Sequence, residues 1–365
     1  VLVPAMPAKS AASAMLTGPG AARYQVAPLT IRGAAAAAGL VPTLRLPRVL
    51  LLGLFLVVDT GQALVMDWAE KRSWDKSRPG RQYARQTALV TESVLSIVSG
   101  VFFAALLAGN AGARSCFNLG QFLKFLPVAA CFALGLSLKM MAVNYFQAGT
   151  IKIVGQLRLP MVAMLSVPML ARSYSWVQWQ VIGIVTTSCI AFVLLKGQGR
   201  NLAGKAWKWK GLSQLFGWMA LNVLGGILAE RTYKAGNMPY YAQKVAQDFG
   251  HLITSLVMLL VVVPHFNPSE NIRDRAQRPG GFFDAWDVRT PAVVGFLFLD
   301  AWIGNLLLKE FSGVTRSVAK ACGVSTVYFA SLFYAKERRS NPALTVLALL
   351  VIQASLLFGC IPSIR

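Results

Sequence analysis

The 365-residue sequence has few acidic residues and almost no histidine. It contains 14 Asp and Glu against 36 Lys and Arg, and its two histidines, His251 and His265, are isolated. An isolated histidine is more often structural than catalytic. The five cysteines are far apart and form no CxxC pair. This spacing argues against a structural zinc site and does not indicate disulfides.

Common enzyme signatures are also missing. The sequence contains no HExxH, GxSxG or GxxxxGK[ST] pattern, and DAWD at 284–287 has the wrong spacing for a metal-nucleotide DxD pair. We therefore expect neither an enzyme nor a bound cofactor.

Apolar residues, by contrast, are abundant. They make up 55% of the chain, the charged fraction is 14%, and mean hydropathy is +0.54. From Val49 onward, apolar spans of roughly 17 to 25 residues recur, which is the length of a membrane-crossing helix. Ten such spans are centred near 58, 98, 134, 160, 186, 221, 255, 300, 326 and 352. The sequence thus predicts an all-α integral membrane protein with ten transmembrane helices in a lipid bilayer.

The net charge of +22 favours anionic partners. Lipid headgroups and a phosphorylated solute fit this charge. Nucleic acid does not, because most of the basic residues lie in short connectors between apolar spans. The distribution of Lys and Arg between the two sides gives no clear membrane orientation.

The chain divides into an N-terminal extension and a helical domain. Residues 1–48 are Ala-rich, contain no Asp or Glu, and are typical of a disordered tail or a targeting presequence. Residues 49–365 form the expected ten-helix domain, with halves at about 49–197 and 208–365. Five spans in each half imply two inverted repeats, an arrangement that places a substrate site at the midplane between the halves.

The fourth span carries charge at membrane depth. Lys152 and Gln156 share a helix face, and Arg158 lies about 120° round from Lys152. Buried cations commonly mark a substrate route, and the planar fork of Arg suits bidentate contact with phosphate. The alternative is that Arg158 and Lys152 reach the membrane interface or neutralise Glu92 or Asp300.

The ninth span repeats this pattern with Arg316, Ser317 and Lys320. The two cations are four residues apart and face the same way. Contact with lipid headgroups is an equally weighted alternative. Glu92 and Asp300 are the deepest acidic candidates, and they either pair with these cations or couple a proton.

The sixth span has a polar stripe. Asn222, Gly226, Glu230 and Tyr233 fall on one face by helical periodicity. Such a stripe usually faces the bundle, where it either contacts a substrate or forms hydrogen bonds between helices.

Several of these segments resemble one family. Residues 121–196 are similar to the nucleotide-sugar transporters of the CMP-sialic acid and UDP-galactose type, within the drug/metabolite transporter superfamily. The resemblance is carried by QLR (156–158), MLARSYS (169–175) and the Gln178–Trp179 pair. Further similarity lies in ALVTESVLS (88–96) and LAERTYKAG (228–236).

The resemblance implies an antiporter that exchanges a nucleotide sugar for a nucleoside monophosphate in the Golgi membrane, with the endoplasmic reticulum or a plastid as alternatives. Arg158 and Arg316 stand where the family has two phosphate-contacting lysines, although Lys320 is an alternative to Arg316. Gln247 matches the glutamine of the seventh-helix RNxQ pattern. That pattern is otherwise altered, beginning at Lys244, and the third-helix QNN is replaced by residues 135–137. The cargo is therefore open within the class.

The expected substrate-binding residues are Arg158, Arg316, Lys152, Gln156, Lys320, Ser317, Asn222, Glu230, Tyr233, Gln247 and Glu92. Two other functions remain open, an organellar sugar-phosphate or small-metabolite carrier of the same fold and a membrane scaffold that does not transport. Assembly into a homo-oligomer is also left open.

Overall fold

The protein is all-helical over the residues that can be described. The computed structural model describes residues 47–71, 85–142, 155–197, 209–235, 238–262, 264, 281–284, 286–334 and 342–360, and none of these forms a strand. The helices of the first half are α1 (Arg48–Lys71), α2 (Arg85–Ser115), α3 (Leu119–Ala142), α5 (Arg158–Leu170) and α6 (Trp176–Gly197). Those of the second half are α7 (Trp209–Ala235), α8 (Tyr240–Val257), α11 (Arg289–Glu310), α12 (Gly313–Tyr334) and α13 (Pro342–Cys360). A π-helical turn, η2 (Met258–Val262), extends α8, and a 3-10 turn, η4 (Gly281–Phe283), precedes α11.

The all-α prediction is confirmed for this part of the chain, and its helices are suited to a bilayer. Six stretches are long and apolar enough to cross a membrane: Arg48–Met66, Gln86–Ser115, Leu119–Lys139, Gly211–Ala235, Tyr240–Val262 and Arg289–Glu310. Shorter apolar helices occupy Arg158–Leu170, Trp176–Phe192 and Pro342–Phe358. The count of ten membrane spans stays a prediction, and the extension at 1–48 falls almost wholly outside the described residues.

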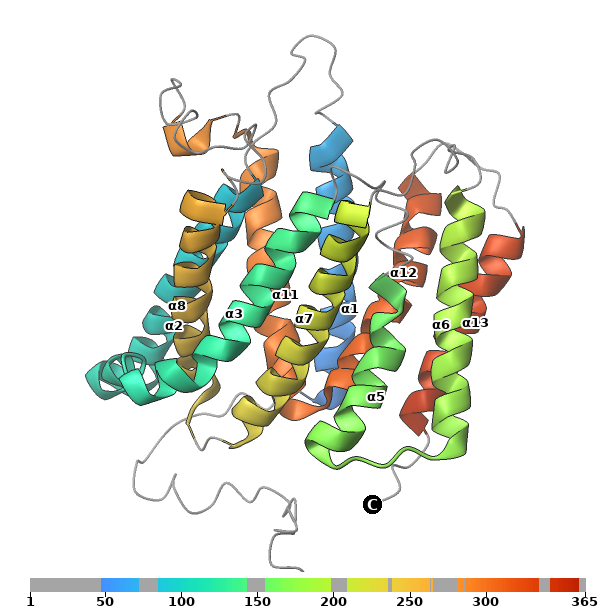
Figure 1. The fold of residues 1–365 in the computed structure, drawn as a ribbon, viewed down its shortest axis with the longest axis horizontal. Coiled ribbons are helices and arrows are strands. Elements are labelled where there is room, and N and C mark those ends of the chain that lie inside the picture. The colour runs from blue at the N-terminus through green and yellow to red at the C-terminus, as the bar shows by residue number, and fades with distance from the viewer. Residues whose placement is uncertain are drawn as a thin grey trace, which may run out of the picture. The chain divides into compact units, whose positions relative to one another are not determined.

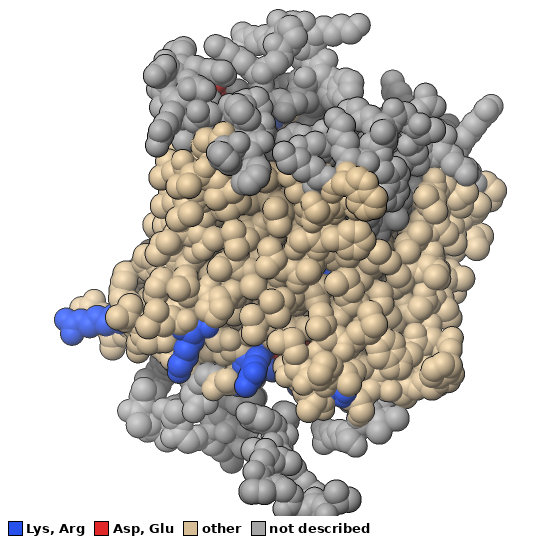
Figure 2. All heavy atoms as spheres, viewed as in Figure 1, with Lys and Arg blue, Asp and Glu red and all other residues tan. Residues whose placement is uncertain are grey.

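One face of the bundle shows how charge is distributed. Figure 2 shows a wide band without visible charge on this face, with Lys and Arg side chains towards its lower end. In the same view, that end is where α2 passes into α3 and where α7 ends (Figure 1). An apolar band with cations at its edge is typical of a lipid-facing surface.

The helices of the two halves interleave. In Figure 1, α2 and α8 lie together on the left and α6 and α13 on the right, with α1, α7 and α11 between these pairs. The most extensive packing joins α3 to α7 and α8, α2 to α8, α1 to α11, and α6 to α13. A large apolar core lies between α5, α6, α7, α12 and α13, and includes Val162, Ile182, Ile227 and Val318. Because α5 and α12 both pack here, their polar residues are brought close together.

Two helices depart from the sequence-based boundaries. The polar stretch 109–118, between the apolar spans centred near 98 and 134, is mostly helical, because α2 bends at Ala108 and Gly109 and then continues to Ser115. Gly109 has φ 60°, a conformation that glycine adopts without steric cost. The described part of the fourth span, α5, is only 13 residues long. Pro160 is its third residue, where a missing backbone N–H costs no intrahelical bond.

Candidate functional site

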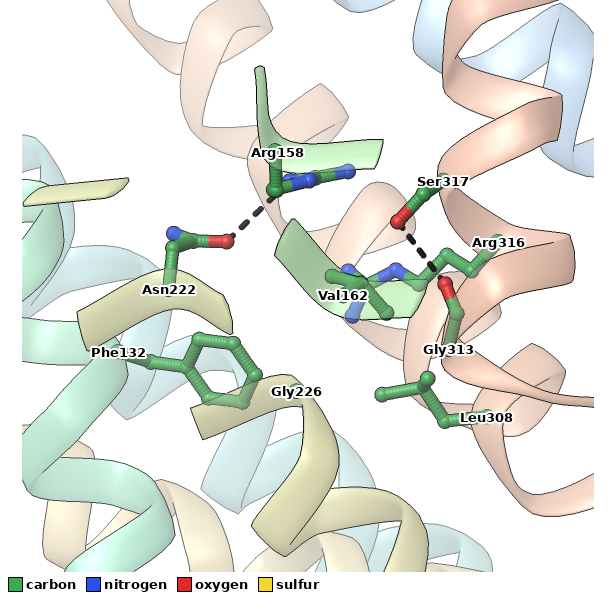
Figure 3. Close-up of a pocket in the computed structure, with 9 residues that line it drawn as sticks. All are labelled: Phe132, Arg158, Val162, Asn222, Gly226, Leu308, Gly313, Arg316 and Ser317. Carbon is green, nitrogen blue, oxygen red and sulfur yellow. Dashed lines mark hydrogen bonds between the residues drawn. The ribbon is translucent and has the colours of Figure 1, made fainter. Parts of the chain in front are cut away.

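A small pocket lies where helices of both halves meet. It is bounded by α3, α5, α7, α11 and α12, and in this conformation it has room for about one water-sized molecule. Figure 3 shows its lining, with Arg158 on α5, Asn222 and Gly226 on α7, and Arg316 and Ser317 on α12. The other lining residues are Phe132, Val162, Leu308 and Gly313. Four of the expected site residues, Arg158, Asn222, Arg316 and Ser317, are therefore brought together.

Arg158 enters the pocket from the first turn of α5. Its Nη1 donates a hydrogen bond to Oδ1 of Asn222, over 3.2 Å. This contact leaves the rest of the guanidinium edge for another acceptor, since Arg carries five donor hydrogens. The charges of Asp59 and Asp300 also act on Arg158, although both carboxylates form their ion pairs with Lys320.

Arg316 reaches the same pocket from the second half. Its guanidinium packs against Gly304 of α11, where an added Cβ would lie 2.7 Å from Nη2. The missing side chain at Gly304 is thus what admits the guanidinium. The Nε of Arg316 is buried, and no described residue accepts a hydrogen bond from it. A buried donor without an acceptor costs about 1–3 kcal/mol, so this position favours a ligand that can accept.

The charge of the lining is wholly positive. Two of its nine residues are arginines and none is acidic. Two like charges that face a poorly solvated cavity repel each other, and an anion between them removes the repulsion. Arg binds phosphate oxygens through parallel N–H···O contacts. The donors of this lining would therefore suit an anion such as phosphate.

Glu230 lies beside the pocket, and its carboxylate already accepts hydrogen bonds from other residues of the protein. It is 1% exposed, and its carboxylate accepts hydrogen bonds from Lys234 Nζ at 2.7 Å and from the backbone N–H of Gly313 at 2.8 Å. Arg172, in the connector between α5 and α6, forms an ion pair with the same carboxylate. We call Arg172, Glu230, Lys234 and Gly313 the Glu230 cluster. This cluster joins the end of α7 to both α12 and the first half.

Lys320 lies between two carboxylates of neighbouring helices. Its Nζ is 3.5 Å from Asp59 of α1 and 3.3 Å from Asp300 of α11. The ammonium group is thus held inside the bundle, which disfavours the headgroup alternative for this residue. Neither Lys320 nor its partners line the pocket. Of the two ninth-span cations, only Arg316 is in a position to contact a ligand there.

We expect Lys320→Met to lower the free energy of unfolding by about 1–3 kcal/mol, because two inward carboxylates lose their shared cation. Thermal unfolding of the purified protein in detergent measures this loss. Lys124→Met, which removes an exposed cation from α3, is the matched control and should change little. Adding Asp59→Asn to Lys320→Met should restore part of the stability, and equal losses for both lysine variants would contradict this account.

The remaining expected site residues lie elsewhere. Tyr233 donates to Gln247 over 2.5 Å, and Asn305 donates to the same oxygen over 3.2 Å, so these side chains link α7, α8 and α11. Glu92 belongs to a separate cluster between α2 and α8. Gln156 is half-buried before α5 and is not in the pocket lining. Lys152 lies outside the described residues.

The sequence did not single out Arg172 of the Glu230 cluster or Asp59, which pairs with Lys320. Arg172 is part of the MLARSYS motif, and Asp59 is the first acidic residue of the chain. A carboxylate near the centre of an apolar span is itself a signal of a buried partner, so Asp59 could have been found in this way. Arg172 offered no comparable signal, since a cation in a connector is normally solvated.

Comparisons with known proteins bear on the fold alone. No family model and no curated protein sequence matches the chain. A solved structure described as "Crystal structure of protein" is similar, with a TM-score of 0.60 over 86% of this chain and 96% of that chain. The two sequences are 10% identical over this match. At this level of identity the likeness establishes that most of the chain adopts the same helical fold as that protein.

Proposed function

We propose that the protein is a membrane antiporter that exchanges a nucleotide sugar for a nucleoside monophosphate by alternating access. One observation carries the proposal: Arg158 and Arg316, from helices of the two halves, line a single pocket that has no acidic residue. A phosphate group between them would contact both halves at once. The resemblance to nucleotide-sugar transporters implies the same two positions, Arg158 within residues 121–196 and Arg316 in the ninth span.

The pairing of helices supports the inverted-repeat part of the proposal. If α1, α2, α3, α5 and α6 correspond in order to α7, α8, α11, α12 and α13, most close pairings recur when the halves are exchanged. The pairing of α1 with α11 corresponds to that of α7 with α3, and α1 with α12 to α7 with α5. The pairings α2 with α8, α5 with α12, and α6 with α13 correspond to themselves. Such a two-fold relation is the architecture on which alternating access commonly depends.

The Glu230 cluster supplies a gate for this mechanism. Gly313 lines the pocket, and its backbone N–H donates to Glu230, so the cluster lies directly next to the cargo site. Arg172 ties the same carboxylate to the α5–α6 connector. Opening the pocket at this end requires these ion pairs to separate, and closing it reforms them. These ion pairs are formed in the present conformation, so in this proposal it corresponds to a closed gate.

A second candidate keeps the fold and changes the cargo. Two arginines that line one pocket suit any solute that carries a phosphate group, and a sugar phosphate is the simplest such solute. The pocket has room for about one water-sized molecule in this conformation, so either cargo requires the helices around it to move apart. An organellar sugar-phosphate carrier of the same fold is therefore the second candidate, and the location follows the cargo, Golgi for the first and plastid for the second.

Filling the pocket tests whether it holds the cargo. An added Cβ at Gly226 meets no heavy atom within 4 Å, so Gly226→Leu places its first carbon without a clash, and we expect the rest of its side chain to fill the cavity. Thermal stabilisation of the purified protein by nucleoside monophosphates, nucleotide sugars and sugar phosphates gives the readout. We expect at least one compound to raise the melting temperature of the native chain, and Gly226→Leu to abolish that rise.

The matched control is Gly183→Leu, because Gly183 is exposed on α6 and an added Cβ there also meets no heavy atom within 4 Å. This variant should keep the ligand response. If no compound in the panel stabilises the native chain, the non-transporting scaffold becomes the better description. If Gly226→Leu responds as the native chain does, the cargo binds elsewhere.

A further inference from the structure

A second group of buried polar side chains lies between α2, α8 and α11. It consists of Glu92, Ser93, Ser96, Lys244, Asp248, His251 and Trp302, which we call the α2–α8 cluster. None of its members lines the pocket described above. Lys244 and Asp248 form an ion pair, and Ser96 donates to Asp248. The indole Nε1 of Trp302 donates to Ser96 over 2.6 Å.

One carboxylate in this cluster, that of Glu92, has no cation of its own. Lys244 is engaged by Asp248, and its Nζ also donates to Ser96 over 3.3 Å. Glu92 is 5% exposed, and its Oε1 has no hydrogen-bond partner among the described residues. An unpaired charge in such a place is costly, and a buried carboxyl group avoids the cost by binding a proton.

His251 is the neighbour that can share this proton. Its Nδ1 is 4.0 Å from Oε2 of Glu92 and shares a hydrogen bond of 2.8 Å with the hydroxyl of Ser93. With one proton between them, the two side chains are either a neutral acid beside a neutral imidazole or a carboxylate beside an imidazolium. Either form leaves the pair neutral, whereas loss of the proton leaves one negative charge inside the bundle.

Lys244 is the nearby cation whose charge acts on Glu92, and among the described residues the other charges around Glu92 are carboxylates or already have partners. On α8, Lys244 is already matched by Asp248. On α11, Asp300 has Lys320 as its partner. The two carboxylates Glu92 and Asp248 therefore share a single lysine, and the cluster lacks one positive charge unless a proton is bound.

The α2–α8 cluster is also connected to the cargo pocket through one helix. On α11, Trp302 contacts Ser96 of the cluster, and two residues further on Gly304 packs against the guanidinium of Arg316. Asn305 of the same turn bonds Gln247 of α8. A change of charge in the cluster that shifted α11 would move the surface on which Arg316 rests.

We propose that Glu92 and His251 form a buried binding site for one exchangeable proton. The site itself is independent of the cargo. Its consequence, that cargo exchange depends on pH through this proton, rests on the function proposed above. Protonation adds H⁺ from solvent to the pair, deprotonation returns it, and no other reactant is needed.

Infrared titration of the purified protein in lipid tests the site without any cargo. We expect a protonated-carboxyl band that grows as the pH is lowered from mildly alkaline to mildly acidic, and that is missing in Glu92→Gln. Glu310→Gln, which removes an exposed carboxylate at the end of α11, is the control and should keep the band. His251→Gln should shift the pH at which the band appears. A band that is the same in Glu92→Gln and the native protein would overturn the proposal, as would its complete absence from the native protein.

Exchange measurements then separate this inference from the proposed function. If cargo exchange occurs, its rate should depend on pH in the native chain and lose most of that dependence in Glu92→Gln. An unchanged pH profile in a variant that still exchanges would contradict the link to transport. If no variant exchanges any cargo, the proposed function fails, while the infrared titration still decides whether the proton site exists.

Discussion

Replacing Arg316 with alanine should weaken binding of a phosphate-bearing cargo about 10- to 100-fold, because a charge-assisted hydrogen bond contributes about 1.5–3 kcal/mol. Arg316→Ala removes a guanidinium whose Nε has no protein acceptor. Arg158→Ala should have a similar effect, since Asn222 uses only one edge of that side chain. Calorimetric titration of the purified protein with a nucleoside monophosphate measures both affinities.

The control for this prediction is Arg114→Ala, because Arg114 is an exposed cation at the end of α2. It has the same change in net charge and should bind as the native chain does. Arg316→Lys should retain the charge but lose the paired donors, so its affinity should fall between those of the native and alanine forms. If all three alanine variants bind equally well, the two arginines do not form the cargo site.

Glu230→Gln should lower the free energy of unfolding by about 1–3 kcal/mol, because the buried carboxylate is lost while its two cations, both partly exposed, keep part of their hydration. The substitution leaves Arg172 and Lys234 without their shared carboxylate, at a residue that is 1% exposed. Chemical unfolding in mixed micelles, followed by tryptophan fluorescence, measures the change. Glu310→Gln removes an exposed carboxylate and should cost far less.

The partners of Glu230 give this prediction a second test. In a double-mutant cycle, Arg172→Met and Glu230→Gln should be strongly non-additive, because they remove the same ion pair. Additive losses would show that Arg172 and Glu230 act separately, and the gate assigned to the Glu230 cluster would then lack its connection to the first half.

Helix positions could be predicted because the length and hydropathy of an apolar run can be measured directly in the sequence. A run of apolar residues such as Arg289–Glu310 identifies itself by length and hydropathy. The bend of α2 at Gly109 was harder, because the same polar residues that mark a connector also fit a solvated final turn of helix. Both conformations satisfy the hydrogen-bonding groups of the backbone, so the sequence alone does not distinguish between them.

Those residues of the candidate site that share a face of a single helix with other polar residues could be predicted from the sequence. Arg158, Asn222, Arg316 and Ser317 were all expected, and they meet in one pocket. Ion-pair partners were not predictable in this way, because a partner depends on which helices pack together and at what height. The stripe on α7 illustrates the difference: it contains Glu230, but its partner Arg172 lies 58 residues away in the sequence.

Gly304 shows why the detailed shape of the pocket escaped prediction. In the sequence it is one glycine among 31, within an apolar span. Its role follows only from the approach of Arg316 on another helix, where any side chain would meet the guanidinium. Tertiary proximity of this kind leaves no periodic signal on either helix.

The central claim is tested most directly by counter-exchange in proteoliposomes. Purified protein is reconstituted into vesicles preloaded with a nucleoside monophosphate, and uptake of each of a panel of labelled nucleotide sugars and sugar phosphates is measured against empty vesicles. We predict uptake of at least one nucleotide sugar that requires the internal nucleoside monophosphate and that is lost in both Arg158→Ala and Arg316→Ala. No exchange with any nucleotide sugar by well-folded, reconstituted protein, or native rates in both arginine variants, would contradict it.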